Sequence, residues 1–98
     1  MSISHGLRPS DVLAQMREEI LAVAARHHAT NVRVFGSVAT GSDTDASDLD
    51  LIVHFAAEAS LYDQIALADE LRELLSVEVD VISDGAAGIE KIAPVVAV

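Results

Sequence analysis

The stretch VFGSVATGSDTDASDLDLIVHF, residues 34–55, decides the fold of this 98-residue chain. It begins as an apolar strand, turns at Gly36-Ser37, and passes through a polar loop into a second strand that opens at Asp48. Glycine permits backbone conformations and close approaches that residues with a Cβ avoid, so this turn is a candidate phosphate-binding site. Asp48 and Asp50 stand two residues apart, which places their side chains on one face of the strand. Such a turn followed by such a strand indicates nucleotide chemistry.

A later strand supplies a third carboxylate. Residues 78–82 alternate, with the valines toward the core and Asp80 on the opposite face. If the strands form one sheet, Asp80 projects from the same face as Asp48 and Asp50. Carboxylates gathered on one face repel one another unless a cation joins them, and oxygen-only ligation beside phosphate is typical of magnesium. A pair of such ions about 3.5–4 Å apart can activate an attacking oxygen and stabilise a leaving pyrophosphate.

The remaining patterns predict helices that cover this sheet. Ser10, in Pro9-Ser10-Asp11, is the expected cap of an amphipathic helix that runs to about His28. Residues 31–35 form the strand before the turn, and Ser37 is expected to cap a one-turn helix through Thr40 that Gly41 closes. Ser60 and Asp63 resemble a capping box that begins a second long helix. The expected buried stripe of that helix is Leu61, Ile65, Ala68, Leu71 and Leu75.

The final segment has no single interpretation. Pro94 argues against a continuous helix over residues 89–98, and Val95 to Val98 form either a strand or a docked tail. With no repeat and no linker, residues 1–98 are expected to be one domain. The predicted class is α+β, a small mixed sheet of three to four strands with two long helices packed on one face.

Composition narrows the class of partner. The chain is 51% hydrophobic but only 3% aromatic, so the core is thin, and we expect a partner or a second copy in a homodimer to cover part of the surface. The net charge is −10 and the six basic residues are scattered singly, which disfavours direct binding of nucleic acid. This charge favours a basic protein partner or a nucleotide that arrives with its own divalent metal. With no signal segment, no membrane span and no cysteine, a soluble cytoplasmic protein is expected.

Gly36-Ser37, ten intervening residues and Asp48-Leu49-Asp50 resemble the signature of the DNA polymerase beta-like nucleotidyltransferase superfamily. Over residues 10–82 the chain is most similar to the minimal nucleotidyltransferase (MNT) family. The resemblance implies the polymerase beta-like fold, with Asp48, Asp50 and Asp80 as the catalytic carboxylates that bind Mg²⁺. It also implies that Gly36 and Ser37 hold the phosphates of ATP.

MNT proteins are typically the antitoxins of HEPN/MNT toxin–antitoxin pairs. The activity that the resemblance implies is transfer of AMP from ATP to a tyrosine of the HEPN ribonuclease toxin. One departure stands out, because Thr40 occupies a position where the family usually carries arginine. Two alternatives therefore stay open: a module with a weak or vestigial site that neutralises its partner by binding, and a nucleotidyltransferase acting on a small molecule.

Other polar and aromatic residues have simpler interpretations. Asp43 and Asp45 are expected to be solvated loop residues, and His54 a neutral residue of the sheet. Arg33 is interpreted as an exposed strand position, although it lies close enough to the turn to meet a phosphate. Tyr62 is the only tyrosine and is expected to pack at the start of its helix.

Overall fold

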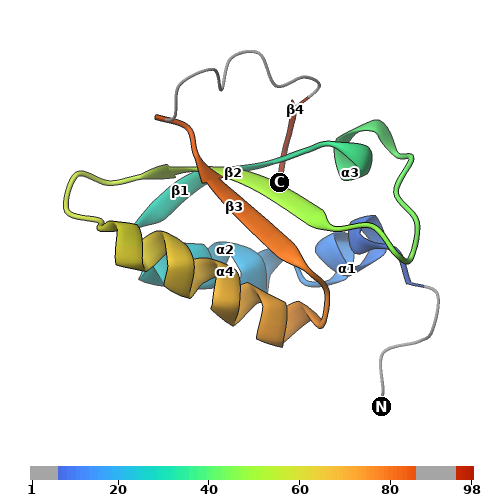
Figure 1. Ribbon diagram of the computed structural model, residues 1–98, viewed down its shortest axis with the longest axis horizontal. Helices are drawn as coiled ribbons and strands as arrows, with labels where there is room; N and C mark the ends of the chain where they lie inside the picture. The colour runs from blue at the N-terminus through green and yellow to red at the C-terminus, as the bar shows by residue number, and fades with distance from the viewer. Residues whose placement is uncertain (1–6, 86–94) are drawn as a thin grey trace.

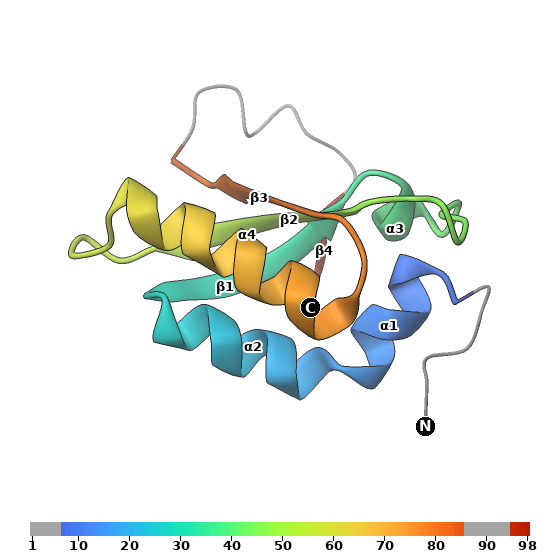
Figure 2. The ribbon, with the colours of Figure 1, turned by 60° about the horizontal axis from the view of Figure 1, so that its bottom comes forward.

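The computed structural model describes residues 7–85 and 95–98. Within them, four strands form one sheet in the order β3-β2-β1-β4. β1 pairs antiparallel with β2 and with β4, and β2 pairs parallel with β3. Helices α1, α2 and α4 cover one face of this sheet (Figures 1 and 2). The predicted α+β class is confirmed. The elements are α1 Pro9–Gln15, α2 Arg17–Arg26, β1 Ala29–Phe35, α3 Ser37–Thr40, β2 Leu49–Phe55, α4 Leu61–Leu75, β3 Val79–Ser83 and β4 Val95–Ala97.

The core lies between the sheet and the helices. β2 is the most buried strand, and its inward side chains, Leu49, Leu51 and Val53, are each 0% exposed. Ile20 of α2 and Leu71 of α4 close the core from the helical side. Each fully buried aliphatic side chain of this size stabilises the fold by roughly 1.5–3 kcal/mol relative to an exposed one. The opposite face of the sheet carries the polar residues of β2 and β3.

The first helical segment differs from the prediction of one helix running to about His28. Met16 leaves the helical conformation and separates α1 from α2, which point in different directions (Figure 2). The cap also differs, since Arg8 is the N-cap residue and Pro9 opens the helix. The N–H of Ser10 instead donates a hydrogen bond to Asp43 Oδ2 at 2.9 Å. This contact with the loop before β2 thus orients α1, and local periodicity does not predict it.

The predicted stripe of α4 is correct only in its second half. Ala68, Leu71 and Leu75 are buried as expected, but Leu61 is 72% exposed and Ile65 is 54% exposed. Leu67, outside the predicted stripe, is fully buried. Apolar residues occupy two adjoining faces at the start of this helix, and spacing alone does not say which face meets the sheet. Packing against β3 and α2 selects one of them.

The C-terminal ambiguity resolves into a strand. β4 pairs with the outer edge of β1, with Val95 opposite Phe35 and Ala97 opposite Arg33. Of the segment left ambiguous, residues 89–94 lie outside the described part of the chain. Among the helices described, none combines the length and the apolar character needed to cross a membrane.

Candidate active site

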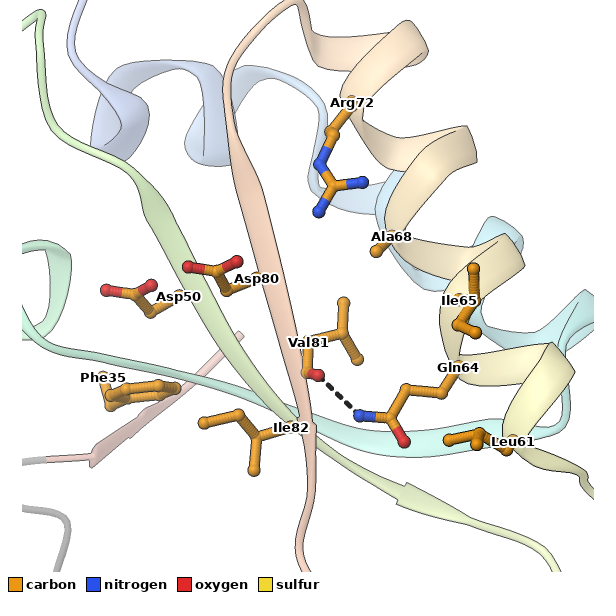
Figure 3. A pocket seen from close by; sticks show the side chains of 10 residues that line it. All are labelled: Phe35, Asp50, Leu61, Gln64, Ile65, Ala68, Arg72, Asp80, Val81 and Ile82. Carbon is orange, nitrogen blue, oxygen red and sulfur yellow. Dashed lines mark hydrogen bonds between the residues drawn. The ribbon is translucent and has the colours of Figure 1, made fainter.

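Two of the three predicted carboxylates lie side by side on the sheet face opposite the helices. Asp50 of β2 and Asp80 of β3 are register partners in the parallel ladder. Register partners project from the same face of a sheet, about one strand spacing (~4.8 Å) apart. Figure 3 shows the two carboxylates next to each other. They come from positions 30 residues apart, and α4 makes the crossover that aligns their strands.

The electrostatic state of Asp50 reflects this arrangement. Its pKa is raised, first because partial burial disfavours the charged form, and then because the negative charges of Asp80 and Asp48 repel it. A hydrogen bond with Asp80 raises it further. A cation that neutralises the charges of these neighbours would therefore stabilise the ionised form of Asp50. The donor set, carboxylate oxygens only, suits magnesium.

Gly36 lies directly against the carboxylate pair. It follows Phe35, whose register partner is Asp50, and has φ 73° and ψ −147°, a region that only glycine occupies readily. A Cβ built on Gly36 would sit 2.9 Å from Asp50 Oδ2. The glycine is therefore required twice, for the turn itself and for the space that the carboxylate fills.

The rest of the turn is ordered by its own hydrogen bonds. The N-cap residue of α3 is Gly36 and not Ser37 as expected, and Ser37 is the first residue of the helix. The Thr40 hydroxyl donates to the carbonyl of Ser37 at 3.1 Å and lies 2.7 Å from the hydroxyl of Ser42. Thr40 thus stabilises the turn and brings no positive charge to it.

Asp48 stands apart from the other two carboxylates. It precedes β2, is exposed, and lines a neighbouring cavity of about 380 Å³ instead of the one that holds Asp50 and Asp80. Its charge nonetheless reaches Asp50. In residues 7–85 and 95–98, no three acidic or histidine side chains are already arranged as a metal-binding group. The three-carboxylate site stays a prediction, with two of its members adjacent.

A cleft of about 550 Å³ runs from the carboxylate pair around the edge strand β3 to α4. Figure 3 shows Phe35, Asp50, Asp80 and Ile82 on one side of β3, and side chains of α4 on the other. Gln64 crosses toward the strand and donates to the carbonyl of Val81 at 2.8 Å. The other lining residues from α4 are Leu61, Ile65, Ala68 and Arg72.

Arg72 is the site residue that sequence reasoning missed. It lines both the cleft with Asp80 and the neighbouring cavity with Asp48. Its guanidinium pairs with two exposed carboxylates, Asp69 Oδ1 at 2.7 Å and Glu78 Oε1 at 3.5 Å. One available signal was its place in the last turn of the helix that leads into β3. Periodicity alone assigns such a residue to a solvated face.

A second polar cluster lies farther along the same sheet face. Arg33 Nη2 pairs with Asp84 Oδ2 at 3.0 Å, and His54 Nδ1 lies 3.2 Å from Asp84 Oδ1. Burial acts to raise the pKa of Asp84, but the hydrogen bonds and charges of His54 and Arg33 outweigh it and lower that pKa. Arg33 is thus held in an ion pair, instead of being simply exposed.

Two residues interpreted as solvated or packed behave otherwise. Asp43 is 3% exposed and accepts the Ser10 N–H, so it anchors α1 and is not a solvated loop residue. Tyr62 is 77% exposed and does not pack as expected. Neither outcome has a local cause. Asp43 is buried by the helix that it holds, and Tyr62 lies on the face of α4 that points away from the sheet.

Comparison with known proteins adds to this geometry. The family model described as "Nucleotidyltransferase domain" matches residues 16–96, most of the chain. The chain belongs to the nucleotidyltransferase domain family. The matched range contains both strands that carry Asp50 and Asp80 and the intervening α4.

Individual relatives of this nucleotidyltransferase domain agree with the assignment. A Methanocaldococcus jannaschii protein named "Putative protein adenylyltransferase MJ0435" is 33% identical over 69 residues, which are 70% of this chain and 74% of the relative. A solved structure described as a "putative minimal nucleotidyltransferase" is 41% identical, with a TM-score of 0.77, over 91% of this chain and 93% of that one. The expected family, the polymerase beta-like fold and the enzyme class, a nucleotidyltransferase, are confirmed.

A more distant structure shares the fold. The complex described as "toxin-antitoxin with AMP-PNP" is 23% identical, with a TM-score of 0.63, over 72% of this chain and 59% of that one. At this identity the likeness between the two chains concerns the fold alone. The roles of the individual site residues here are inferred from the geometry above.

Proposed function

We propose that this chain is a magnesium-dependent adenylyltransferase that transfers AMP from ATP to a tyrosine hydroxyl of a HEPN-family ribonuclease toxin, and thereby acts as its antitoxin. The reaction would take place in the cytoplasm, where ATP is supplied. The chain is proposed to bind the toxin as a hetero-oligomer and to make no direct contact with nucleic acid. Its net charge of −10 supports a partner that is itself basic enough to bind RNA.

The observation that carries the proposal is the register pairing of Asp50 with Asp80 beside Gly36. Two like charges held side by side, with Asp50 partly buried and Asp80 exposed, repel each other, and such pairs are characteristic of sites where a cation or a proton is handled. Gly36 and Ser37, at the end of β1, provide the adjoining turn for the distal phosphates. The relative named as a protein adenylyltransferase supports AMP as the transferred group and a protein as the acceptor.

The proposed transfer is an in-line displacement at the α-phosphorus. A bond forms between the acceptor oxygen and the α-phosphorus, and the bond from that phosphorus to the bridging oxygen of the β-phosphate breaks. Pyrophosphate leaves on the side of Gly36. Asp80 lies on the other side of Asp50 from the turn, where it can accept the hydroxyl proton.

Asp50 and Asp80, together with Asp48, would hold Mg²⁺. The bound ion would supply neutralisation of the triphosphate charge and of the charge that develops on the leaving pyrophosphate. The protein's own contribution is to fix the carboxylates on two paired strands. Strand-borne groups stay in place better than groups on loops.

The proposal is tested by detecting the covalent product of the reaction. The wild-type chain, incubated with Mg²⁺, ATP and a co-expressed HEPN-family toxin, should leave AMP on a toxin tyrosine that mass spectrometry detects. Asp48→Asn and Asp50→Asn should each abolish the modification, with an unchanged circular dichroism spectrum. Full modification by both variants would refute the carboxylate assignment.

A binding module without catalysis is the second candidate, and Thr40 is the observation that favours it. Its hydroxyl is engaged within the turn, and the position offers no charge for a phosphate. In that case the toxin would be inhibited in the complex without any AMP adduct, and ATP would have no effect on inhibition. The same mass-spectrometric assay separates the two functions.

A further inference from the structure

We propose that the exposed apolar face at the start of α4 is the docking surface for the protein that presents the acceptor hydroxyl. We call this surface the α4 patch and define it as Leu61, Tyr62 and Ile65. The inference rests on the proposed function, since it concerns the acceptor of that reaction. It adds where the acceptor protein binds and from which side its hydroxyl enters the site.

The exposure of the α4 patch is the first observation. Leu61, Tyr62 and Ile65 are 72%, 77% and 54% exposed, and all lie in the first two turns of one helix. Large apolar side chains that gather on one face mark interaction sites more often than singly scattered ones. Tyrosine contributes a large contact area at a small cost in side-chain entropy, which suits a binding surface.

The order of the strands gives the direction of approach. Asp80, Asp50 and Phe35 are neighbours across β3, β2 and β1, and Gly36 follows Phe35. In an in-line displacement the attacking oxygen and the leaving pyrophosphate stand on opposite sides of the phosphorus. With pyrophosphate on the β1 side, the acceptor must arrive from the β3 side. Among the strands that the structure describes, β3 is an edge of the sheet, and a cleft lies on this side.

The cleft connects that entrance to the α4 patch. Leu61 and Ile65 line the same 550 Å³ cleft as Asp50 and Asp80 (Figure 3). Ile65 and Tyr62 also line a smaller cavity of about 310 Å³ on the outer side of the helix. A protein that reaches across the β3 edge and places a hydroxyl beside Asp80 would therefore also cover the α4 patch.

Charge identifies the chemistry of the partner. The outer cavity is completed by Ala66 and by three acids, Asp69, Glu70 and Glu73. Arg26 and His27 pair with Glu70, and Arg72 pairs with Asp69, whose side chain is still 68% exposed. Glu73 is exposed. An apolar centre with an acidic rim, on a chain of net charge −10, complements an apolar surface rimmed by lysine or arginine. We infer a basic partner protein, not a second copy of this acidic chain.

The experiment compares Ile65→Lys with Ala22→Lys. Both substitutions add one positive charge at an exposed helical position, but Ala22 lies on α2 and lines none of these cavities. The probe is the co-expressed HEPN-family toxin, with its Kd measured by calorimetry without ATP and its KM measured by AMP incorporation. Ile65→Lys should raise the Kd and the toxin KM about 10- to 100-fold. Ala22→Lys should behave as wild type in both measurements.

The outcomes separate this inference from the proposed function. If the wild type modifies the toxin and Ile65→Lys does so with an unchanged KM and Kd, the docking surface is wrong and the function stands. If the wild type binds the toxin through Ile65 but transfers no AMP, the function fails and the docking surface stands. If Ile65→Lys converts a dimer of the isolated chain to a monomer by light scattering, with toxin binding unchanged, the patch joins two copies and the inference is overturned. If both variants have the same Tm as the wild type, a folding defect is excluded.

Discussion

Replacing Gly36 by alanine tests the geometry at the centre of the site. The backbone of Gly36 lies at φ 73° and ψ −147°, where a residue with a Cβ costs roughly 1–3 kcal/mol. The new Cβ would also meet Asp50 Oδ2 at 2.9 Å, so the carboxylate must move. We expect a total loss of about 3 kcal/mol in the free energy of unfolding, which lowers Tm by about 12–24 °C in a domain of this size.

Gly41→Ala is the matched control, because Gly41 ends the same short helix. It also has a positive φ, 76°, but an added Cβ there meets nothing within 4 Å. It should cost only about 1 kcal/mol, or roughly 4–8 °C in Tm. Differential scanning calorimetry measures both losses. AMP transfer should fall about 100-fold in Gly36→Ala, because a displaced carboxylate misplaces the reacting groups, and should be retained in Gly41→Ala.

A double-mutant cycle isolates the contact with Asp50. In an Asp50→Ala background the side chain that the new Cβ would strike is absent, so Gly36→Ala should cost about 1 kcal/mol less than in the wild type. The backbone strain remains and sets the residual loss. Equal losses in both backgrounds, or equal losses for Gly36→Ala and Gly41→Ala, would refute the close approach of the turn to the carboxylate.

Two further predictions concern stability. Asp50→Asn should raise the free energy of unfolding of the metal-free protein by roughly 0.5–1 kcal/mol at low ionic strength, because it removes the repulsion from Asp80. This gain should shrink in 0.5 M salt. If urea titrations show that the variant is less stable than the wild type, the repulsion between the two carboxylates does not destabilise the fold. Asp43→Ala should cost about 1 kcal/mol, because the Ser10 N–H loses its acceptor, whereas Asp45→Ala in the same loop should be neutral within about 0.3 kcal/mol. Burial acts to raise the pKa of Asp43, but the hydrogen bonds from Ser10 outweigh it and lower that pKa. The contribution of Asp43 is therefore complete above about pH 4 and declines as pH falls through the lowered pKa, so the difference between wild type and Asp43→Ala should narrow in acid.

The sequence predicted the strands around the turn well because their signals are local. Alternation placed Leu49 and Leu51 in the core and Asp50 on the opposite face. Gly36 was singled out for close approach to a ligand, and the structure adds an approach to Asp50 that no local pattern encodes. Met16 carries no helix-breaking signal, so the division between α1 and α2 could not be predicted.

Local chemistry therefore determined which residues form strands, where the chain turns at glycine, and which carboxylates face away from the core. Only the tertiary structure decided that β3 lies parallel to β2 at the sheet edge, which makes Asp80 the neighbour of Asp50. It likewise decided that Ile65 is exposed while Leu67 is buried. The physical reason is that spacing fixes the faces of an element, whereas the partner of each face depends on contacts between residues far apart in the chain.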